Sequence, residues 1–150
     1  MTLSAKLKQL IGKSSAPLVI EVEKSQVRRF AAAIGETDPI HFDEVAAKAA
    51  GFSSLVAPPT FAAALIAPEV FVEDFGWDPQ SIMHRAEEYE YFRPICAGDV
   101  LHITQRISDV YEQAGQGQDV LVFAVVESRA HDAKNRAVWK GRRVLVKLNN

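Results

Sequence analysis

In the stretch PPTFAAALIAP, residues 58–68, almost every side chain is apolar. Pro59 is well placed to start a helix, because proline is favoured at the first helical position, and Pro68 has to end it. A helix over residues 59–67 would have no polar face, and such a helix must be surrounded by other parts of the protein. We therefore expect this helix at the centre of the fold.

Four long segments that follow this helix, and one shorter segment before it, have the composition of β-strands. They are rich in Val, Ile, Tyr and Phe, and the sequences between the later ones contain Gly, Pro, Asp and Asn, the residues of turns. Short connections favour antiparallel neighbours. The expected fold is α+β, a five-stranded antiparallel sheet curled around the central apolar helix. The predicted strands are residues 17–23, 84–92, 100–112, 119–130 and 137–148.

Two further helices are expected between the first strand and the central helix. Residues 26–34 carry apolar side chains at helical spacing, with Ser25 as a candidate N-cap and Gly35 as a stop. Asp43 can cap a second short helix over residues 44–50. Both helices therefore border the polar sequence that lies between them.

Composition indicates one globular domain over residues 1–150. Its 17 basic and 19 acidic residues give a net charge of −2 and are scattered, so we expect no nucleic-acid partner. No apolar run approaches the roughly 20 residues of a membrane span, and the first residues lack the pattern of a signal peptide, so we expect a cytoplasmic protein without membrane contact. The single cysteine, Cys96, excludes an internal disulfide and fits a packing role. Leu3, Leu7 and Leu10 predict a short amphipathic helix docked on the domain.

The polar sequence AIGETDPIHFD, residues 33–43, holds the candidate catalytic groups. Glu36, Asp38 and His41 place two carboxylates and an imidazole within six positions, and these are the side chains that move protons in acid–base catalysis. The alternative is structural. Acids commonly cap turns, and His41 can fasten the loop to Asp38 or Asp43.

Two segments together resemble a known family. FAAAIGETDPIHFDEVAAKAAGFSSLVAPPTFAAAL, residues 30–65, followed by YFRPICAGDVLHI, residues 91–103, resembles the MaoC-like (R)-specific enoyl-CoA hydratase and 3-hydroxyacyl dehydratase family, and within it the amino-terminal MaoC dehydratase subgroup. The resemblance runs in order over about residues 11–148. The family motif is G-D-x-N-P-L-H, where this chain has GETDPIH from Gly35 to His41. The resemblance implies a hot-dog fold.

The resemblance also implies a reaction and its residues. A hydratase or dehydratase of this family interconverts a 2-enoyl thioester and a (R)-3-hydroxyacyl thioester, as part of fatty acid metabolism. Carried over to this chain, Glu36 and His41 hold the reacting water, and Asp38 takes the position of the asparagine. The resemblance implies no cofactor; coenzyme A or an acyl carrier arm enters only as part of the substrate. His84, His102 and His131 lack the spacing of metal ligands, so we expect no metal site.

The sequence APPTF departs from the family, whose active members usually carry His-Gly before the central helix. Pro58 falls on the glycine, and neither Pro58 nor Pro59 has an N–H to stabilise negative charge on the thioester oxygen. Thr60 is the first backbone donor left, and it is the predicted oxyanion and substrate-binding residue.

Three functional alternatives remain open at this point. The first is an active enzyme acting on an acyl-CoA or acyl-carrier thioester, and the second is a non-catalytic hot-dog subunit that binds acyl chains and pairs with a catalytic partner. A hot-dog thioesterase is less favoured because the hydratase loop is present. A sheet of this kind leaves an edge to be paired, so we expect a homodimer or a heterodimer with a second hot-dog subunit. The acyl chain, its carrier and the direction of the reaction stay open.

Two possible roles stay open for each of two further groups of side chains. The aromatic side chains within positions 71–77 can cover an acyl pocket or pack over the central helix. Six arginines can contact phosphates of the substrate or serve as ordinary surface charge. The three aromatic residues are Phe71, Phe75 and Trp77, and the arginines are Arg28, Arg29, Arg85, Arg93, Arg142 and Arg143.

Overall fold

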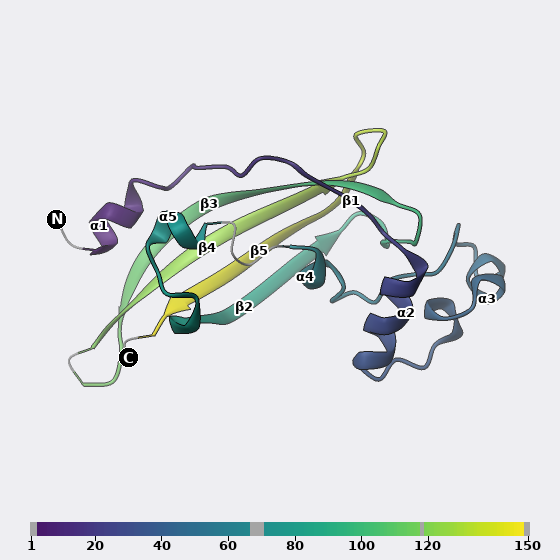
Figure 1. Ribbon diagram of the computed structural model, residues 1–150, viewed down its shortest axis with the longest axis horizontal. Helices are drawn as coiled ribbons and strands as arrows, with labels where there is room; N and C mark the ends of the chain where they lie inside the picture. The colour runs from purple at the N-terminus through teal and green to yellow at the C-terminus, as the bar shows by residue number, and fades with distance from the viewer. Residues whose placement is uncertain (1–2, 67–70, 118, 149–150) are drawn as a thin grey trace.

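A five-stranded antiparallel sheet forms the body of the protein, in a computed structural model that describes residues 3–66, 71–117 and 119–148 (Figure 1). The strand order is β1-β3-β4-β5-β2, so β1 and β2 are the two edges. All five predicted strands are confirmed, with ends that shift by a few residues. The strands are β1 Leu18–Glu21, β2 Ile82–Tyr91, β3 Val100–Ala114, β4 Val120–His131 and β5 Ala137–Lys147.

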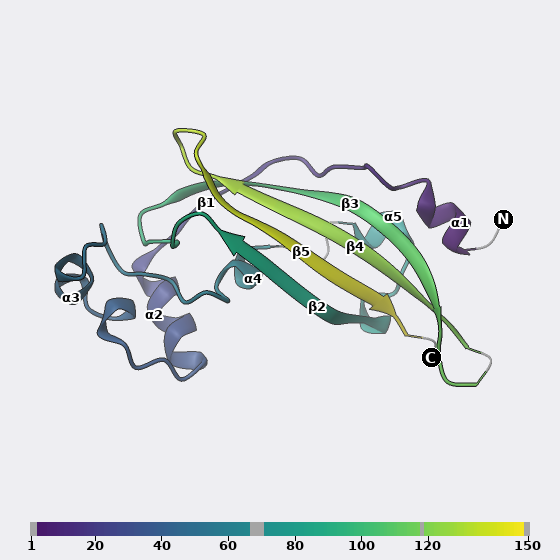
Figure 2. The ribbon, with the colours of Figure 1, turned by 180° about the vertical axis from the view of Figure 1, so that it is seen from behind.

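Helices cover one face of the sheet and extend beyond one of its ends. α4 and α5 lie in front of the strands in Figure 1 and behind them in Figure 2, so both occupy the same face. α1 lies beside α5, whereas α2 and α3 lie together at the opposite end (Figure 1). The helices are α1 Leu3–Lys8, α2 Lys24–Ala33, α3 Glu44–Ala49, α4 Ala62–Leu65 and α5 Val72–Phe75, with 3-10 helices η1 Pro39–His41 and η2 Pro79–Ser81.

The central helix is shorter than the sequence predicts. Instead of residues 59–67, α4 spans Ala62–Leu65. Pro58 and the proline after it donate no hydrogen bond, and the chain first closes in a tight turn in which the Phe61 N–H donates to the Pro58 carbonyl at 2.9 Å. The predicted end at Pro68 lies outside the described residues.

The central helix is buried on one side and open on the other. Phe61, Ala62, Leu65 and Ile66 are all less than 10% exposed and belong to the main hydrophobic core. Ala64 is exposed in the single chain. The central position of the helix is confirmed, whereas the prediction that the chain surrounds it on every side is wrong.

Two hydrophobic clusters fill the face of the sheet that carries the helices. The first joins α4 to the strands, where Leu101 and Trp139 are at most 1% exposed. The second joins Trp77 of the segment after α5 to Leu7 of α1. The predicted docking of an amphipathic N-terminal helix is therefore confirmed, and the aromatic residues of residues 71–77 serve packing.

Hydrogen bonds at the helix ends correct one predicted cap and confirm another. α2 begins after Glu23, whose N–H donates to the Gln26 side chain at 3.1 Å, so Ser25 lies inside the helix and is not its N-cap. Asp43 does cap α3, because its carboxylate accepts from the Val45 N–H at 2.9 Å. α2 thus begins one residue earlier than Ser25, and α3 begins at a capped end directly after the polar loop.

The outer edge of β2 has no neighbouring strand among the described residues. An edge of ten residues with free backbone donors and acceptors is a surface that proteins normally cover or pair. In the described ranges, no helix has the length and apolar character that crossing a bilayer requires.

Candidate active site

The loop that carries Glu36 and His41 is held by backbone hydrogen bonds at both ends. Gly35, with φ of 78°, ends α2 in the left-handed region that favours glycine, and the Glu36 N–H returns to the Ala31 carbonyl at 2.9 Å. The chain then turns into η1, whose last residue is His41. Hydrogen bonds between residues close in sequence therefore fix the backbone positions of Glu36 and His41.

His41 is buried and has a defined tautomer. Its side chain is 8% exposed, and its Nδ1 lies 2.5 Å from the Val56 carbonyl oxygen. Because a carbonyl only accepts, Nδ1 carries the proton and Nε2 of the neutral ring keeps a lone pair. Val56 is itself anchored, since its N–H donates to the Ile40 carbonyl at 3.0 Å. Whenever the ring is neutral, His41 thus presents the lone pair of Nε2 in a fixed direction.

Glu36 faces that nitrogen. The distance from Glu36 Oε2 to His41 Nε2 is 3.8 Å, which exceeds a direct hydrogen bond, and the Glu36 side chain is 38% exposed. Two acceptors at this separation can both bond to the same water molecule. The structure therefore brings together the two titratable groups that the sequence singled out.

Asp38 lies in the same loop but makes a structural contact. Its carboxylate caps η1 by accepting from the Ile40 N–H at 3.1 Å, and the residue is exposed. The structural alternative expected the His41 ring to bond to Asp38 or Asp43. This expectation is wrong, because the ring bonds to the Val56 carbonyl. Among these three acids, only Glu36 approaches the imidazole.

A mostly apolar cavity of about 530 Å³ opens beside His41. Such a volume is in the range that holds a small organic ligand. The turn before α4 forms one wall, and the segment that follows β2 forms another. Its lining includes His41, Pro58, Pro59, Tyr91, Phe92 and Ile95.

The turn at residues 58–61 carries the predicted donor Thr60 next to this cavity. Thr60 is exposed, and its carbonyl accepts from the Ala63 N–H at 3.1 Å. The hydroxyl of Tyr91, at the end of β2, donates to the Pro59 carbonyl. Burial raises the pKa of Tyr91 to about 12, and the neighbouring Ala62 backbone acts against that rise.

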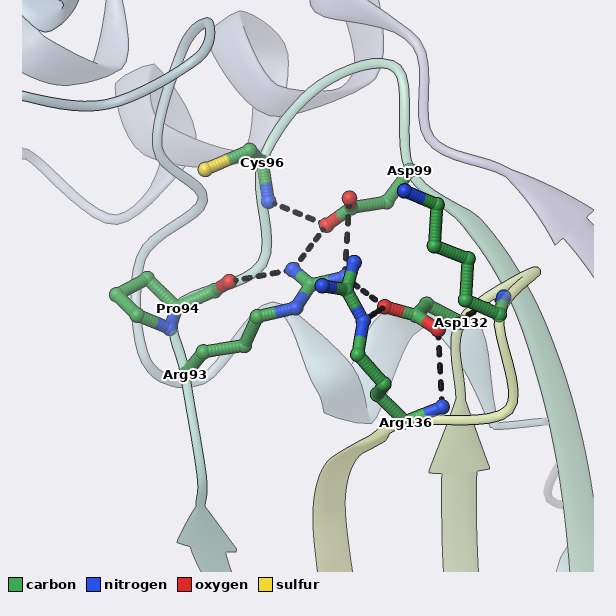
Figure 3. A network of polar contacts seen from close by, with 7 residues as sticks. Arg93, Pro94, Cys96, Asp99, Asp132 and Arg136 are labelled. Atoms are coloured by element: carbon green, nitrogen blue, oxygen red, sulfur yellow. Dashed lines mark hydrogen bonds and ion pairs between the residues drawn. The ribbon is translucent and has the colours of Figure 1, made fainter.

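An ionic network fixes the segment that forms the opposite wall (Figure 3). Arg93 binds Asp99 through both terminal nitrogens, at 2.8 and 3.2 Å, and Asp99 also accepts from the Cys96 N–H at 2.8 Å. Asp132, in the turn between β4 and β5, lies 3.6 Å from Arg93. Cys96 is buried, as its predicted packing role requires.

Asp132 is the second carboxylate of this network. It accepts from the backbone N–H of Arg136 at 2.9 Å, from that residue's Nε at 2.8 Å, and from the Lys134 N–H at 2.9 Å. The bond from the Arg136 backbone contributes most to lowering the pKa of Asp132 to about 2. The wall of the cavity is thus tied to the far turn of the sheet.

Arg143 is buried, which neither expectation for the arginines, phosphate contact or surface charge, anticipated. It is 6% exposed and not surface charge, and its Nε lies 2.5 Å from the Glu87 carboxylate. Glu87 also accepts from the Tyr89 hydroxyl at 2.8 Å. The signal was available, because the alternation of β5 puts Arg143 on the same face as the buried Trp139 and Leu145.

Comparison with known proteins identifies the family. A model of the FAS1-like dehydratase domain region matches residues 9–140. The chain belongs to this FAS1-like dehydratase family. Within the curated proteins, a UPF0336 protein of Saccharopolyspora erythraea is 40% identical over 110 residues, which make up 70% of each chain.

Solved structures similar to this FAS1-like dehydratase chain are hot-dog proteins. The HadBC (3R-hydroxyacyl-ACP dehydratase) complex of Mycobacterium tuberculosis matches with a TM-score of 0.77 and 27% identity, over 91% of this chain and 96% of that chain. A MaoC-like dehydratase matches with a TM-score of 0.83 and 26% identity, over 95% of this chain and 43% of that chain. The resemblance to MaoC-like proteins and the hot-dog fold are both confirmed.

Proposed function

We propose that this FAS1-like dehydratase is an active hydratase and dehydratase that interconverts a 2-enoyl thioester and a (R)-3-hydroxyacyl thioester. The observation that carries the proposal is the pair of His41 Nε2 and Glu36 Oε2, 3.8 Å apart and beside an apolar cavity of about 530 Å³. The cavity suits an acyl chain, and the pair suits one water molecule.

The contact of His41 Nδ1 with the Val56 carbonyl constrains the reaction. When the imidazole is neutral and the carboxylate is ionised, Nε2 and Glu36 both accept from the water. As the water oxygen bonds to the third carbon, one of the two groups takes its proton, and the π electrons move toward the thioester oxygen. The same proton then passes to the second carbon. One water is consumed, and dehydration is the same sequence in reverse.

A hydration assay tests the proposal. Purified protein is expected to consume crotonyl-CoA and to form the (R)-3-hydroxy product, and Glu36→Gln is expected to reduce turnover by at least about 100-fold, the contribution of one general acid–base group. The matched control is Asp43→Asn, which changes an acid of the same loop that caps α3 and lies outside the pair. Equal turnover of Glu36→Gln and wild type, with unchanged melting, would overturn the proposal.

The second candidate is a non-catalytic hot-dog subunit that binds acyl chains and pairs with a catalytic partner. The observation that favours it is the turn at Pro58 and Pro59, which offers few backbone donors for a developing oxyanion. We propose a dimer in either case, because the outer edge of β2 is unpaired. Light scattering that gives a dimer mass, with no hydration by the dimer alone and hydration after addition of a second hot-dog protein, would favour this candidate.

A further inference from the structure

The backbone donors of the turn before α4 are almost all absent or already used. Pro58 and Pro59 have no N–H, and the Phe61 N–H donates to the Pro58 carbonyl. Within the turn itself, residues 58–61, the Thr60 N–H is the one backbone donor that forms no hydrogen bond among the described residues. A second donor for an oxyanion at this wall of the cavity can therefore come from a side chain.

Tyr91 is the side chain in the right place. Its hydroxyl bonds to the turn itself, donating to the Pro59 carbonyl, and it lines the same cavity as His41. Its raised pKa of about 12, which burial causes, keeps the hydroxyl protonated at any ordinary assay pH. The Pro59 carbonyl belongs to an exposed residue, so it can bond to water when the hydroxyl turns away.

We propose that Tyr91 donates the hydrogen bond that stabilises the thioester oxygen during hydration. This inference rests on the proposed function and assigns a further catalytic residue to it. The hydroxyl leaves the Pro59 carbonyl and donates to the substrate oxygen as negative charge develops there. A side chain thereby replaces the donor that Pro58 removes from the backbone.

Turnover by Tyr91→Phe gives the first test. Loss of one oxyanion donor lowers kcat by about 100- to 1,000-fold, and KM is expected to change little because the bond strengthens only in the transition state. The matched control is Tyr89→Phe, which removes the neighbouring hydroxyl that donates to Glu87. We expect Tyr89→Phe to keep kcat within about threefold of wild type, by the same reasoning. Equal kcat in Tyr91→Phe and wild type would overturn the assignment.

A spectroscopic readout separates donation from structural support. 2,4-Hexadienoyl-CoA absorbs at longer wavelength when its carbonyl accepts a strong hydrogen bond, so its bound spectrum reports the donor directly. The red shift is expected in wild type and Tyr89→Phe, and is expected to be much smaller in Tyr91→Phe. If Tyr91→Phe fails to fold, 3-fluorotyrosine at position 91 keeps the shape and has a more acidic hydroxyl. A larger red shift supports the proposal, and an unchanged one overturns it.

The two readouts distinguish failure of this inference from failure of the proposed function. If wild type shifts the spectrum, Tyr91→Phe loses the shift and neither hydrates any enoyl-CoA, Tyr91 stays the donor and the proposed activity is removed. If wild type hydrates enoyl-CoA and Tyr91→Phe equals it in kcat and in spectrum, the proposed activity stands and only the assignment of Tyr91 fails. A wild-type protein that does not bind the thioester removes both.

Discussion

On one side of the cavity lies the loop from Glu36 to His41, which presents a carboxylate and an imidazole and is held by backbone hydrogen bonds. On the other side lies the turn from Pro58 to Phe61, which presents almost no backbone donor. The loop keeps an acid and a histidine at the spacing of the family motif. The turn keeps the shape of a helix start, but the prolines remove its N–H groups. The difference indicates that the acid–base half of such a site keeps a carboxylate and an imidazole at a fixed spacing, whereas the donor of the oxyanion half can move to another residue.

His41 and the turn are each fixed by a contact with another segment. His41 bonds to the Val56 carbonyl, and Asp38 caps the 3-10 helix that ends at His41. The turn is held by the Tyr91 hydroxyl, which bonds to a residue 32 positions earlier in the chain. Substitution of His41 or of Tyr91 can therefore change folding as well as chemistry, so melting is measured beside turnover for both.

The largest expected effect is that of His41→Ala. Removing the imidazole takes away one of the two groups that hold the water, so turnover of crotonyl-CoA is expected to fall by at least about 100-fold, within the 100- to 10,000-fold range of acid–base groups. Thermal melting measured alongside reports whether loss of the bond to Val56 unfolds the loop. Turnover near wild type in a folded His41→Ala variant would assign the loop to structure and remove the contrast between the walls.

A smaller effect is expected from the network behind the cavity wall. Because the pKa of Asp132 in the folded protein, about 2, lies below its ordinary value, its contribution to stability is complete above that ordinary value and is lost as pH falls through about 2. The melting temperature of Asp132→Asn is expected to lie below that of wild type at neutral pH, and the two are expected to converge toward pH 2. Thermal melting as a function of pH measures this.

The control for Asp132 is Asp78→Asn, which changes an acid that caps η2 through the Gln80 N–H, away from the network. Its difference from wild type should not grow between pH 2 and pH 4. A constant gap between Asp132→Asn and wild type across that interval would show that the carboxylate charge does not hold the wall.

The smallest expected effect is that of Asp38→Asn. Asparagine caps a helix about as well as aspartate, so the free energy of unfolding is expected to change by only a few tenths of a kcal/mol. Turnover is expected to stay within about threefold of wild type. The measurement is kcat with crotonyl-CoA beside a melting curve. A loss of 100-fold would place the Asp38 carboxylate in the chemistry, where its contact with the Ile40 N–H gives no sign of it.

Most of the fold could be predicted from the sequence because its signals are local. Turn residues separate all the later strands, and Asp43 and Gly35 mark helix boundaries through their own side chain or backbone. The length of α4 could not be predicted in the same way. Pro59 favours a helix start, but the pair of prolines first closes a tight turn, and the helix begins three residues later.

In the candidate site, too, residues placed by a local motif could be predicted, whereas residues brought in by distant contacts could not. Glu36 and His41 are five positions apart, and a motif places them. Tyr91 reaches the turn from the far end of β2, and Asp132 reaches Arg93 from another turn of the sheet, so neither contact leaves a trace in local spacing. Asp38 caps η1, as the structural alternative for the acids of this loop expects, and its part in the chemistry stays a prediction.

A double-variant measurement tests most directly whether Glu36 and His41 act together on one water. The value of kcat/KM with crotonyl-CoA is compared among wild type, Glu36→Gln, His41→Ala and the variant that carries both changes. Groups that act as a unit are strongly non-additive, so the double variant is expected to be about as impaired as the worse single variant. Losses that multiply, so that the double variant falls by the product of the two single effects, would contradict a shared water and the mechanism built on it.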